Sequence, residues 1–280
     1  MASFRYVVAD VFTDRPLTGN QVAVFTDARE IPEESLQPIA REMNYSETVF
    51  VYRAEGDGDV RIRIFTPSLE LPFAGHPVLG TAFVLAAPLQ REVIRLETGA
   101  GVVPVALERE GAKIVFGRME QPLPTWRPYE REAELLAALR VARSELPVEV
   151  YDLGPTHVYV ALASPEEVAA LAPDLGRLAE HSVGANCFAG EGTRWKTRMF
   201  APFHGVPEDP ATGSGAGPLA VHLLRHGRIR SGEQIEISQG AEIGRPSTLF
   251  ALAEGTAERI ERVSVGGSAV TVAHGELTLP

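Results

Sequence analysis

The chain has 280 residues, 45% of them hydrophobic, which is enough for one large core or for two cores of ordinary size. Its formal net charge is -11, and its basic residues are scattered among acidic ones. This pattern excludes the basic patch of a protein that binds nucleic acid or an anionic membrane. The single cysteine, Cys187, excludes an internal disulfide framework and a multi-cysteine metal site.

No secretion signal is visible in the first residues, "MASFRYVVADVF". The most apolar run, "FAGHPVLGTAFVLAAPL", is too short to span a bilayer. We therefore expect a globular protein of the cytoplasm.

In the first half of the chain, short runs rich in valine, isoleucine and phenylalanine predict strands. They cover residues 4–12, 21–26, 48–53, 60–66, 93–98, 102–108 and 113–117. The amphipathic segment "PEESLQPIAREM", which starts at Pro32, predicts a helix. A second helix is predicted over 77–87, and because it is apolar on every side, we expect protein to enclose it.

The proline-rich segment "QPLPTWRP", residues 121–128, is the predicted linker to a second half of similar design. This half is expected to hold an exposed helix at about 130–142 and an enclosed helix from Ser214. Pro218 is tolerated there because it falls in the first turn. Strands are predicted at 147–152, 157–162, 183–189, 195–200, 234–238, 248–252, 260–265 and 269–279.

The two halves repeat one another in sequence. The segment "RIRIFTPSLELPFAGHPVLGTA" is echoed by "KTRMFAPFHGVPEDPATGSGAGPLA", and "ETGAG" by "SQGAE", in the same order along the chain. The repeat predicts an α+β protein of two pseudo-symmetric domains, each a curved mixed sheet wrapped around a central helix. The predicted domains are 1–122 and 129–280, with a return of the last strand to the first domain as the alternative.

In both copies a glycine motif lies at the start of the enclosed helix, where free N–H groups and the helix dipole bind anions. Neither copy has the lysine that a nucleotide phosphate loop of this kind requires. We therefore expect the two helix ends to face each other across a cleft and to hold one small carboxylate ligand.

Several of these motifs resemble those of the PhzF family of phenazine biosynthesis, which shares its fold with diaminopimelate epimerase. They are "NYSETVFV", "FTPSLELPFAGHPVLGTA", "NCFAGEGTRWKTRMFAP", "EDPATGSGAGPLAVHLLRHG" and "QGAEIGRPSTLFA". The resemblance covers nearly the whole chain. It implies an isomerase that needs no cofactor, acts on trans-2,3-dihydro-3-hydroxyanthranilate and forms a homodimer.

The epimerases use one cysteine at each glycine motif as a two-base pair. Here the matching positions are Ala74 and Thr212, so a thiol pair is excluded. The resemblance assigns the general acid and base to Glu47 in "YSETVF", with Ser46 and Thr48 anchoring its turn. One carboxylate suffices because the carbon that loses a proton and the carbon that gains one belong to one conjugated system.

The resemblance also assigns His76 and Asp209 to catalysis, through hydrogen bonds to the hydroxyl and amino groups of the substrate. It also implies that the substrate is bound by Gly75, Gly213, Ser214, Ser46 and Thr212, and that the two glycines and Ser214 hold its carboxylate.

Other reactive side chains are expected to be structural. We interpret Cys187 as a buried small hydrophobe, and Trp126, His157 and Trp195 as packing residues. His222 and His226 have the spacing of metal ligands on a helix, but no third ligand is visible nearby, and no metal site is predicted. Two other readings of the whole chain stay open: an isomerase of another small cyclic or amino-acid substrate, and a non-catalytic carboxylate-binding protein.

Overall fold

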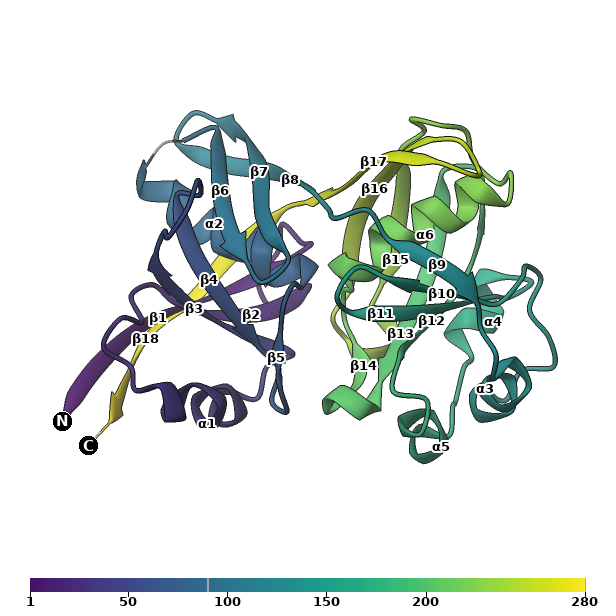
Figure 1. The fold of residues 1–280 in the computed structure, drawn as a ribbon, viewed down its shortest axis with the longest axis horizontal. Coiled ribbons are helices and arrows are strands. Elements are labelled where there is room, and N and C mark those ends of the chain that lie inside the picture. The colour runs from purple at the N-terminus through teal and green to yellow at the C-terminus, as the bar shows by residue number, and fades with distance from the viewer. Residues whose placement is uncertain (90, 280) are drawn as a thin grey trace. The chain divides into compact units, whose positions relative to one another are not determined.

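The computed structural model describes residues 1–89 and 91–279. This part of the chain divides into two compact units (Figure 1). Unit 1 consists of Met1–Glu120 and the residues from Gly266 onward, and unit 2 consists of Gln121–Val265. No helix among the described residues has the length and apolar character needed to cross a membrane.

Unit 1 is a mixed sheet with two helices. Its strands are β1 (Ala2–Val11), β2 (Asn20–Phe25), β3 (Glu47–Arg53), β4 (Val60–Phe65), β5 (Glu70–Leu71), β6 (Val93–Thr98), β7 (Gly101–Glu110), β8 (Lys113–Glu120) and β18 (Ala269–Leu279). The pairs β2–β3 and β4–β6 are parallel, and the pairs β1–β18, β1–β2, β3–β4, β4–β5, β6–β7 and β7–β8 are antiparallel. Helix α1 (Glu33–Met43) connects β2 to β3, as a parallel pair requires.

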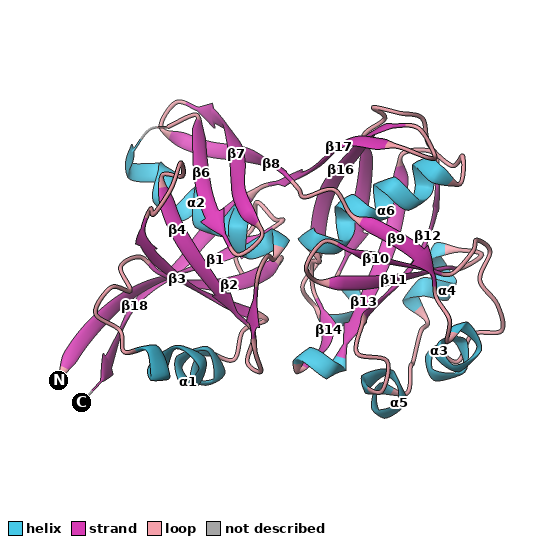
Figure 2. Cartoon of the chain, in the orientation of Figure 1, coloured by secondary structure: helices cyan, strands magenta, loops and turns pink. Residues whose placement is uncertain are grey.

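Helix α2 (Gly75–Leu89) is the central element of unit 1. It packs against β1, β2, β3, β6, β7, β8 and β18, and in Figure 2 these strands surround it. Its side chains at Val78, Leu79 and Ala82 are fully buried, as the all-apolar sequence predicts. Gly80 lets the helix approach β1 and β2, since a Cβ there would lie 2.7 Å from side-chain carbons of Val11 and Val22.

Unit 2 has the same plan. Its strands are β9 (Thr125–Pro128), β10 (Glu149–Asp152), β11 (Thr156–Ala161), β12 (Gly184–Glu191), β13 (Arg194–Ala201), β14 (Val206–Asp209), β15 (Ile235–Gln239), β16 (Ser247–Gly255) and β17 (Ile260–Gly267). The pairs β11–β12 and β13–β15 are parallel, while β9–β10, β10–β11, β12–β13, β13–β14 and β15–β16 are antiparallel. From β10 to β16 this repeats the order of pairings from β1 to β7, so the sequence repeat corresponds to a repeat of topology.

The central helix of unit 2 is α6 (Gly213–Arg225), which packs against β11 and β16. Every residue of α6 from Gly213 to Leu223 is buried, which confirms the prediction of an enclosed helix. The shorter helices of the unit are α3 (Glu132–Leu139), α4 (Pro165–Ala169), α5 (Leu175–Ala179) and two 3-10 turns, η1 (Pro202–His204) and η2 (Ala241–Ile243).

The structure differs from the sequence predictions in a few short elements. The second half of the predicted linker is β9, which pairs with β10 and places Trp126 opposite Tyr151. Strands β5 and β14 and helices α4 and α5 were not predicted, because two to five residues are too few to show a period. The strand predicted over 269–279 pairs with β1 along its length and belongs to unit 1.

Candidate functional site

In unit 1, three residues distant in sequence form what we call the N-terminal group: Asn20, Glu47 and His76. Asn20 begins β2 and Glu47 begins β3, and these strands are parallel, so both side chains lie at the same edge of the sheet. His76 is the second residue of α2, and its Nε2 lies 3.1 Å from Glu47 Oε2. The structure therefore brings two of the predicted catalytic side chains together.

The protonation of His76 follows from its partners. The Asn20 amide nitrogen lies 3.1 Å from His76 Nδ1, and His76 Nε2 lies 3.3 Å from the Gln21 carbonyl oxygen. Because a carbonyl only accepts, Nε2 carries the ring proton and Nδ1 accepts from Asn20. Burial lowers the pKa of His76 to about 3, so this ring is neutral near pH 7.

The remaining predicted residues of unit 1 lie beside this group. Gly75 is the first residue of α2, and its amide precedes the first intrahelical hydrogen bond. Ser46 is half-buried and immediately precedes Glu47 at the start of β3. Ala74, at the position of the epimerase cysteine, is buried and carries no group that can transfer a proton.

In unit 2, a second set of residues surrounds the start of α6. We call Asp209, Thr212, Ser214 and Gln239 the C-terminal group. The Thr212 hydroxyl donates to Asp209 Oδ2 at 2.7 Å and accepts from Gln239 Nε2 at 2.9 Å. Gln239 Nε2 also donates to the backbone oxygen of Asp209 at 2.8 Å. Gln239, the last residue of β15, thus fixes the conformation of the turn "DPAT", residues 209–212.

The start of α6 offers backbone donors. The first hydrogen bonds of the helix run from the amides of Gly215 and Ala216 to the Thr212 oxygen. The amides of Gly213 and Ser214 precede these bonds and are oriented for an acceptor beyond the helix end. With the partial positive charge of the helix terminus, this geometry suits a carboxylate.

Sequence reasoning missed three of the residues that organise these groups. Asn20 and Asn186 were not singled out, and Gln239 was seen only as part of the echo "SQGAE". His157, interpreted as a packing residue, is buried in β11, and its Nε2 lies 3.0 Å from Ser214 Oγ. Single polar residues inside strands carry no local signal, because only the fold decides which helix end they meet.

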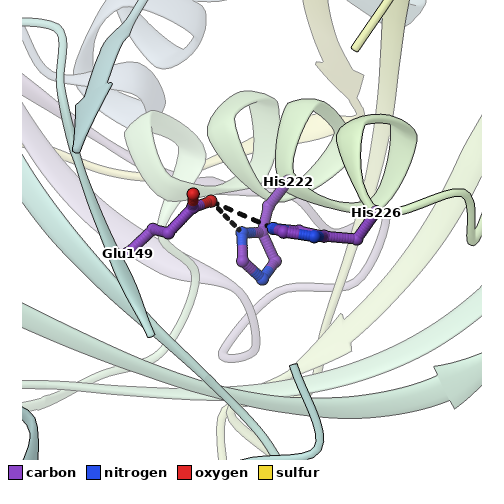
Figure 3. Close-up of side chains that lie close together, drawn as sticks. All are labelled: Glu149, His222 and His226. Atoms are coloured by element: carbon purple, nitrogen blue, oxygen red, sulfur yellow. Dashed lines mark hydrogen bonds and ion pairs between the residues drawn. The ribbon is translucent and has the colours of Figure 1, made fainter. Parts of the chain in front are cut away.

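A separate cluster lies in unit 2, where β10 meets α6. Figure 3 shows the imidazoles of His222 and His226 directed at one carboxylate oxygen of Glu149, at 3.2 and 3.1 Å. Their candidate ligand atoms all lie within 4.8 Å of one another, so the sequence-based statement that no third ligand is nearby was wrong. The absence of a metal site stays an expectation.

The electrostatics of the cluster favour an ion pair over a cation site. Arg225 Nη1 lies 2.5 Å from the same Glu149 oxygen, and its guanidinium stacks on the Trp126 ring at 4.4 Å from the centroid. These charged and hydrogen-bonded neighbours hold the pKa of Glu149 well below its usual range, against the opposing effect of burial. The histidine nitrogens facing this carboxylate act as N–H donors and would have to lose their protons to bind a metal beside a fixed positive charge.

Cys187 lies fully buried in β12, and burial raises the pKa of its thiol to about 12. A neutral, enclosed thiol is neither a nucleophile nor a proton carrier. The prediction that it is a small core residue is confirmed.

Comparison with known proteins identifies the family. A family model described as phenazine biosynthesis-like protein matches residues 9–275. The trans-2,3-dihydro-3-hydroxyanthranilate isomerase of Pseudomonas aeruginosa is 54% identical over 276 residues, which is 98% of this chain and 99% of that protein. Among solved structures, the PhzF-family protein of Bacillus anthracis has a TM-score of 0.86 at 23% identity, over the whole of both chains.

The same fold extends to epimerases. A hydroxyproline epimerase from Agrobacterium vitis has a TM-score of 0.68 at 13% identity and covers 99% of this chain and 91% of its own. The predicted α+β class and epimerase-like architecture are therefore confirmed. With a family model that matches almost the full length and a relative more than half identical, the chain belongs to the family of phenazine biosynthesis-like proteins.

Proposed function

We propose that this protein is an isomerase that converts trans-2,3-dihydro-3-hydroxyanthranilate to its amino-ketone tautomer, a step of phenazine biosynthesis. The observation that carries the proposal is the Glu47–His76 pair at 3.1 Å, found in a chain 54% identical to an isomerase of that name. The pair offers a carboxylate as base and a neutral imidazole as hydrogen-bond donor.

In the proposed mechanism Glu47 removes the proton at ring carbon C3. The electron pair of the broken C–H bond enters the conjugated system, and Glu47 returns a proton at C1. The resulting enol then tautomerises to the ketone. Atoms and electrons balance within the substrate, so the reaction requires neither an oxidant nor a cofactor.

His76 and Asp209 complete the proposed catalytic set. The Nε2–H of His76 lies 3.3 Å from the Gln21 carbonyl oxygen and 3.1 Å from Glu47 Oε2, and we assign it to the substrate hydroxyl. Asp209 is buried, and its Oδ2 accepts from Thr212, which orients the carboxylate towards the substrate amino group.

Backbone and hydroxyl groups form the proposed carboxylate cradle. We assign Gly75, Gly213 and Ser214 to the substrate carboxylate, since their amides lie at the starts of α2 and α6. Ser46 and Thr212 are assigned to the same substrate. The Thr212 hydroxyl already gives its proton to Asp209, so this side chain acts by accepting or through Asp209.

We place the enzyme in the cytoplasm, as a homodimer. A reduced and buried Cys187 as the one cysteine suits a reducing compartment, and the dimer rests on the family resemblance. Light scattering at micromolar concentration tests the dimer directly.

The decisive experiment is conversion of trans-2,3-dihydro-3-hydroxyanthranilate, followed by absorbance, with wild type and Glu47→Gln. Glutamine keeps the shape of the side chain and removes the base. We expect kcat to fall by about 1000-fold, because a positioned general acid and base contributes roughly 100- to 10,000-fold. Binding of the product mimic 3-hydroxyanthranilate, measured by calorimetry, should be retained.

Glu42→Gln is the matched control, because Glu42 is exposed on α1 and undergoes the same chemical change. Wild-type turnover by Glu47→Gln would contradict the assigned base. A wild type that binds the substrate without converting it would favour a carboxylate-binding protein. A wild type that neither binds nor converts it would point to another small cyclic or amino-acid substrate.

A further inference from the structure

His157 has two hydrogen-bond partners on other elements. It is the second residue of β11, only 3% exposed. Its Nε2 lies 3.0 Å from Ser214 Oγ on α6, and its Nδ1 lies 3.1 Å from the amide nitrogen of Asn186 on β12. The ring also fits tightly, since a Cβ at Gly184 would lie 3.0 Å from Nδ1.

The orientation of the Asn186 amide is fixed by a second bond. Its Nδ2 also lies 3.1 Å from the Gly184 carbonyl oxygen. A carbonyl can only accept, so the atom facing it must be the amide nitrogen and not the amide oxygen. The other proton of this nitrogen then points to His157 Nδ1, which must accept it.

The state of the imidazole follows. Burial lowers the pKa of His157 to about 3, so near neutral pH the ring holds a single proton. With Nδ1 accepting, this proton is on Nε2 and is donated to Ser214 Oγ. Asn186 therefore determines, through the imidazole, that the serine oxygen accepts.

We propose that His157 is a positioning residue that directs the proton of the Ser214 hydroxyl to the carboxylate of the substrate. The serine oxygen accepts from His157, so its own proton is left for a ligand. Among the residues that the structure describes, His157 is the one that forms a hydrogen bond with this hydroxyl. A carboxylate presents only acceptors and takes this proton, whereas an amino or amide N–H group would meet only the remaining lone pair of the serine oxygen and leave the proton unused.

The N-terminal group has the same arrangement. There an asparagine amide, from Asn20, faces Nδ1 of a neutral histidine, and Nε2 of His76 carries the proton toward an acceptor. Asparagine and histidine thus set donor and acceptor roles at the start of both central helices. His76 and Ser214 occupy equivalent second positions in α2 and α6.

This inference rests on the proposed function, and the test separates the two. Calorimetry compares 3-hydroxyanthranilate with 2-aminophenol, the same ring without its carboxylate. For His157→Phe, which keeps a ring and removes both nitrogens, we expect Kd for 3-hydroxyanthranilate to rise about tenfold and Kd for 2-aminophenol to stay unchanged. Ser214→Ala should raise Kd for 3-hydroxyanthranilate about as much as His157→Phe does. The double variant should raise it no more than either single variant.

His157→Gln is the conservative variant, since its side-chain amide can donate to Ser214 and should recover part of the affinity. In turnover, KM should rise while kcat changes little, as expected for lost ground-state binding. His181→Phe serves as the control, because His181 is another buried histidine of unit 2, bonded to Tyr129.

Equal rises in Kd for both probes in His157→Phe would overturn the inference, and so would wild-type affinity in both His157→Phe and His157→Gln. In either case, conversion of the substrate by the wild type would still support the proposed function. Failure of the wild type to bind 3-hydroxyanthranilate and to convert the substrate would instead overturn the proposed function, and this inference with it. Melting temperatures of each variant confirm that the comparison is made between folded proteins.

Discussion

In unit 2, Glu149 is the common hydrogen-bond acceptor of the cluster that contains His222 and His226. Its Oε2 accepts from Tyr151, His222, Arg225 and His226, and its side chain is only 10% exposed. Tyr151 belongs to β10, His222 and Arg225 belong to α6, and His226 caps the end of α6, so the carboxylate ties the central helix to the sheet. Its removal would leave Arg225 with an uncompensated charge.

We therefore expect Glu149→Gln to lower the free energy of unfolding by about 3 kcal/mol, the usual cost of breaking a buried ion pair from one side. Urea unfolding followed by circular dichroism measures this loss. Glu236→Gln, at an exposed position of β15, should change it by less than about 0.5 kcal/mol. Equal effects of the two substitutions would show that the cluster does not stabilise unit 2.

At the scale of elements, the central helices depend on small residues where they meet strands. Alanine at position 80 would favour α2 by its helix propensity, by about 1 kcal/mol. Its Cβ would, however, lie 2.7 Å from methyl carbons of Val11 and Val22, a distance that packed carbons do not tolerate. Packing against β1 and β2 should outweigh propensity here.

We predict that Gly80→Ala destabilises the protein by about 2 kcal/mol. Gly176→Ala is the counterpart in helix α5, where the glycine is exposed and the nearest atom to an added Cβ is 3.4 Å away. There, alanine should be neutral or stabilising. Thermal melts of the two variants decide the point, and a stable Gly80→Ala protein would contradict the close approach of helix and strands.

At the scale of the whole molecule, neutral buried histidines make stability depend on pH. Burial lowers the pKa of His76 and of His157 to about 3, and it also lowers the pKa of His222. The unfolded chain binds these protons at about pH 6.5, whereas the folded chain does not. Stability is therefore greatest above pH 6.5 and is lost as the pH falls from there towards 3.

For His76 and for His157, the expected slope is about 1.4 kcal/mol per pH unit between pH 6 and 4. His157→Gln should reduce the slope by about that amount, while His274→Gln, at an exposed position of β18, should leave it unchanged. Urea titrations at intervals of half a pH unit measure it. A slope that is the same in wild type and His157→Gln would mean that His157 is charged in the folded state.

The strand and helix order was readable from the sequence because periodicity is a local property. Alternating strands such as β7 and apolar helices such as α2 bury faces that their own residues define. The short strands β5, β9 and β14 were not readable, since their pairing depends on partner strands and not on their own composition. The repeat and the motif around Glu47 were also visible, because they lie in contiguous stretches.

The sequence by itself determined the α+β class, the duplicated plan, the glycine motifs at two helix starts and the family that they resemble. Only the tertiary structure decided that Asn20 bonds His76, that Asn186 and His157 govern Ser214, and that Glu149 faces His222. These partners lie up to 73 residues apart. Their contacts depend on strand register and on which end of a helix meets which strand. A hydrogen bond forms only when donor and acceptor are held within about 3 Å, and that requires the packed fold.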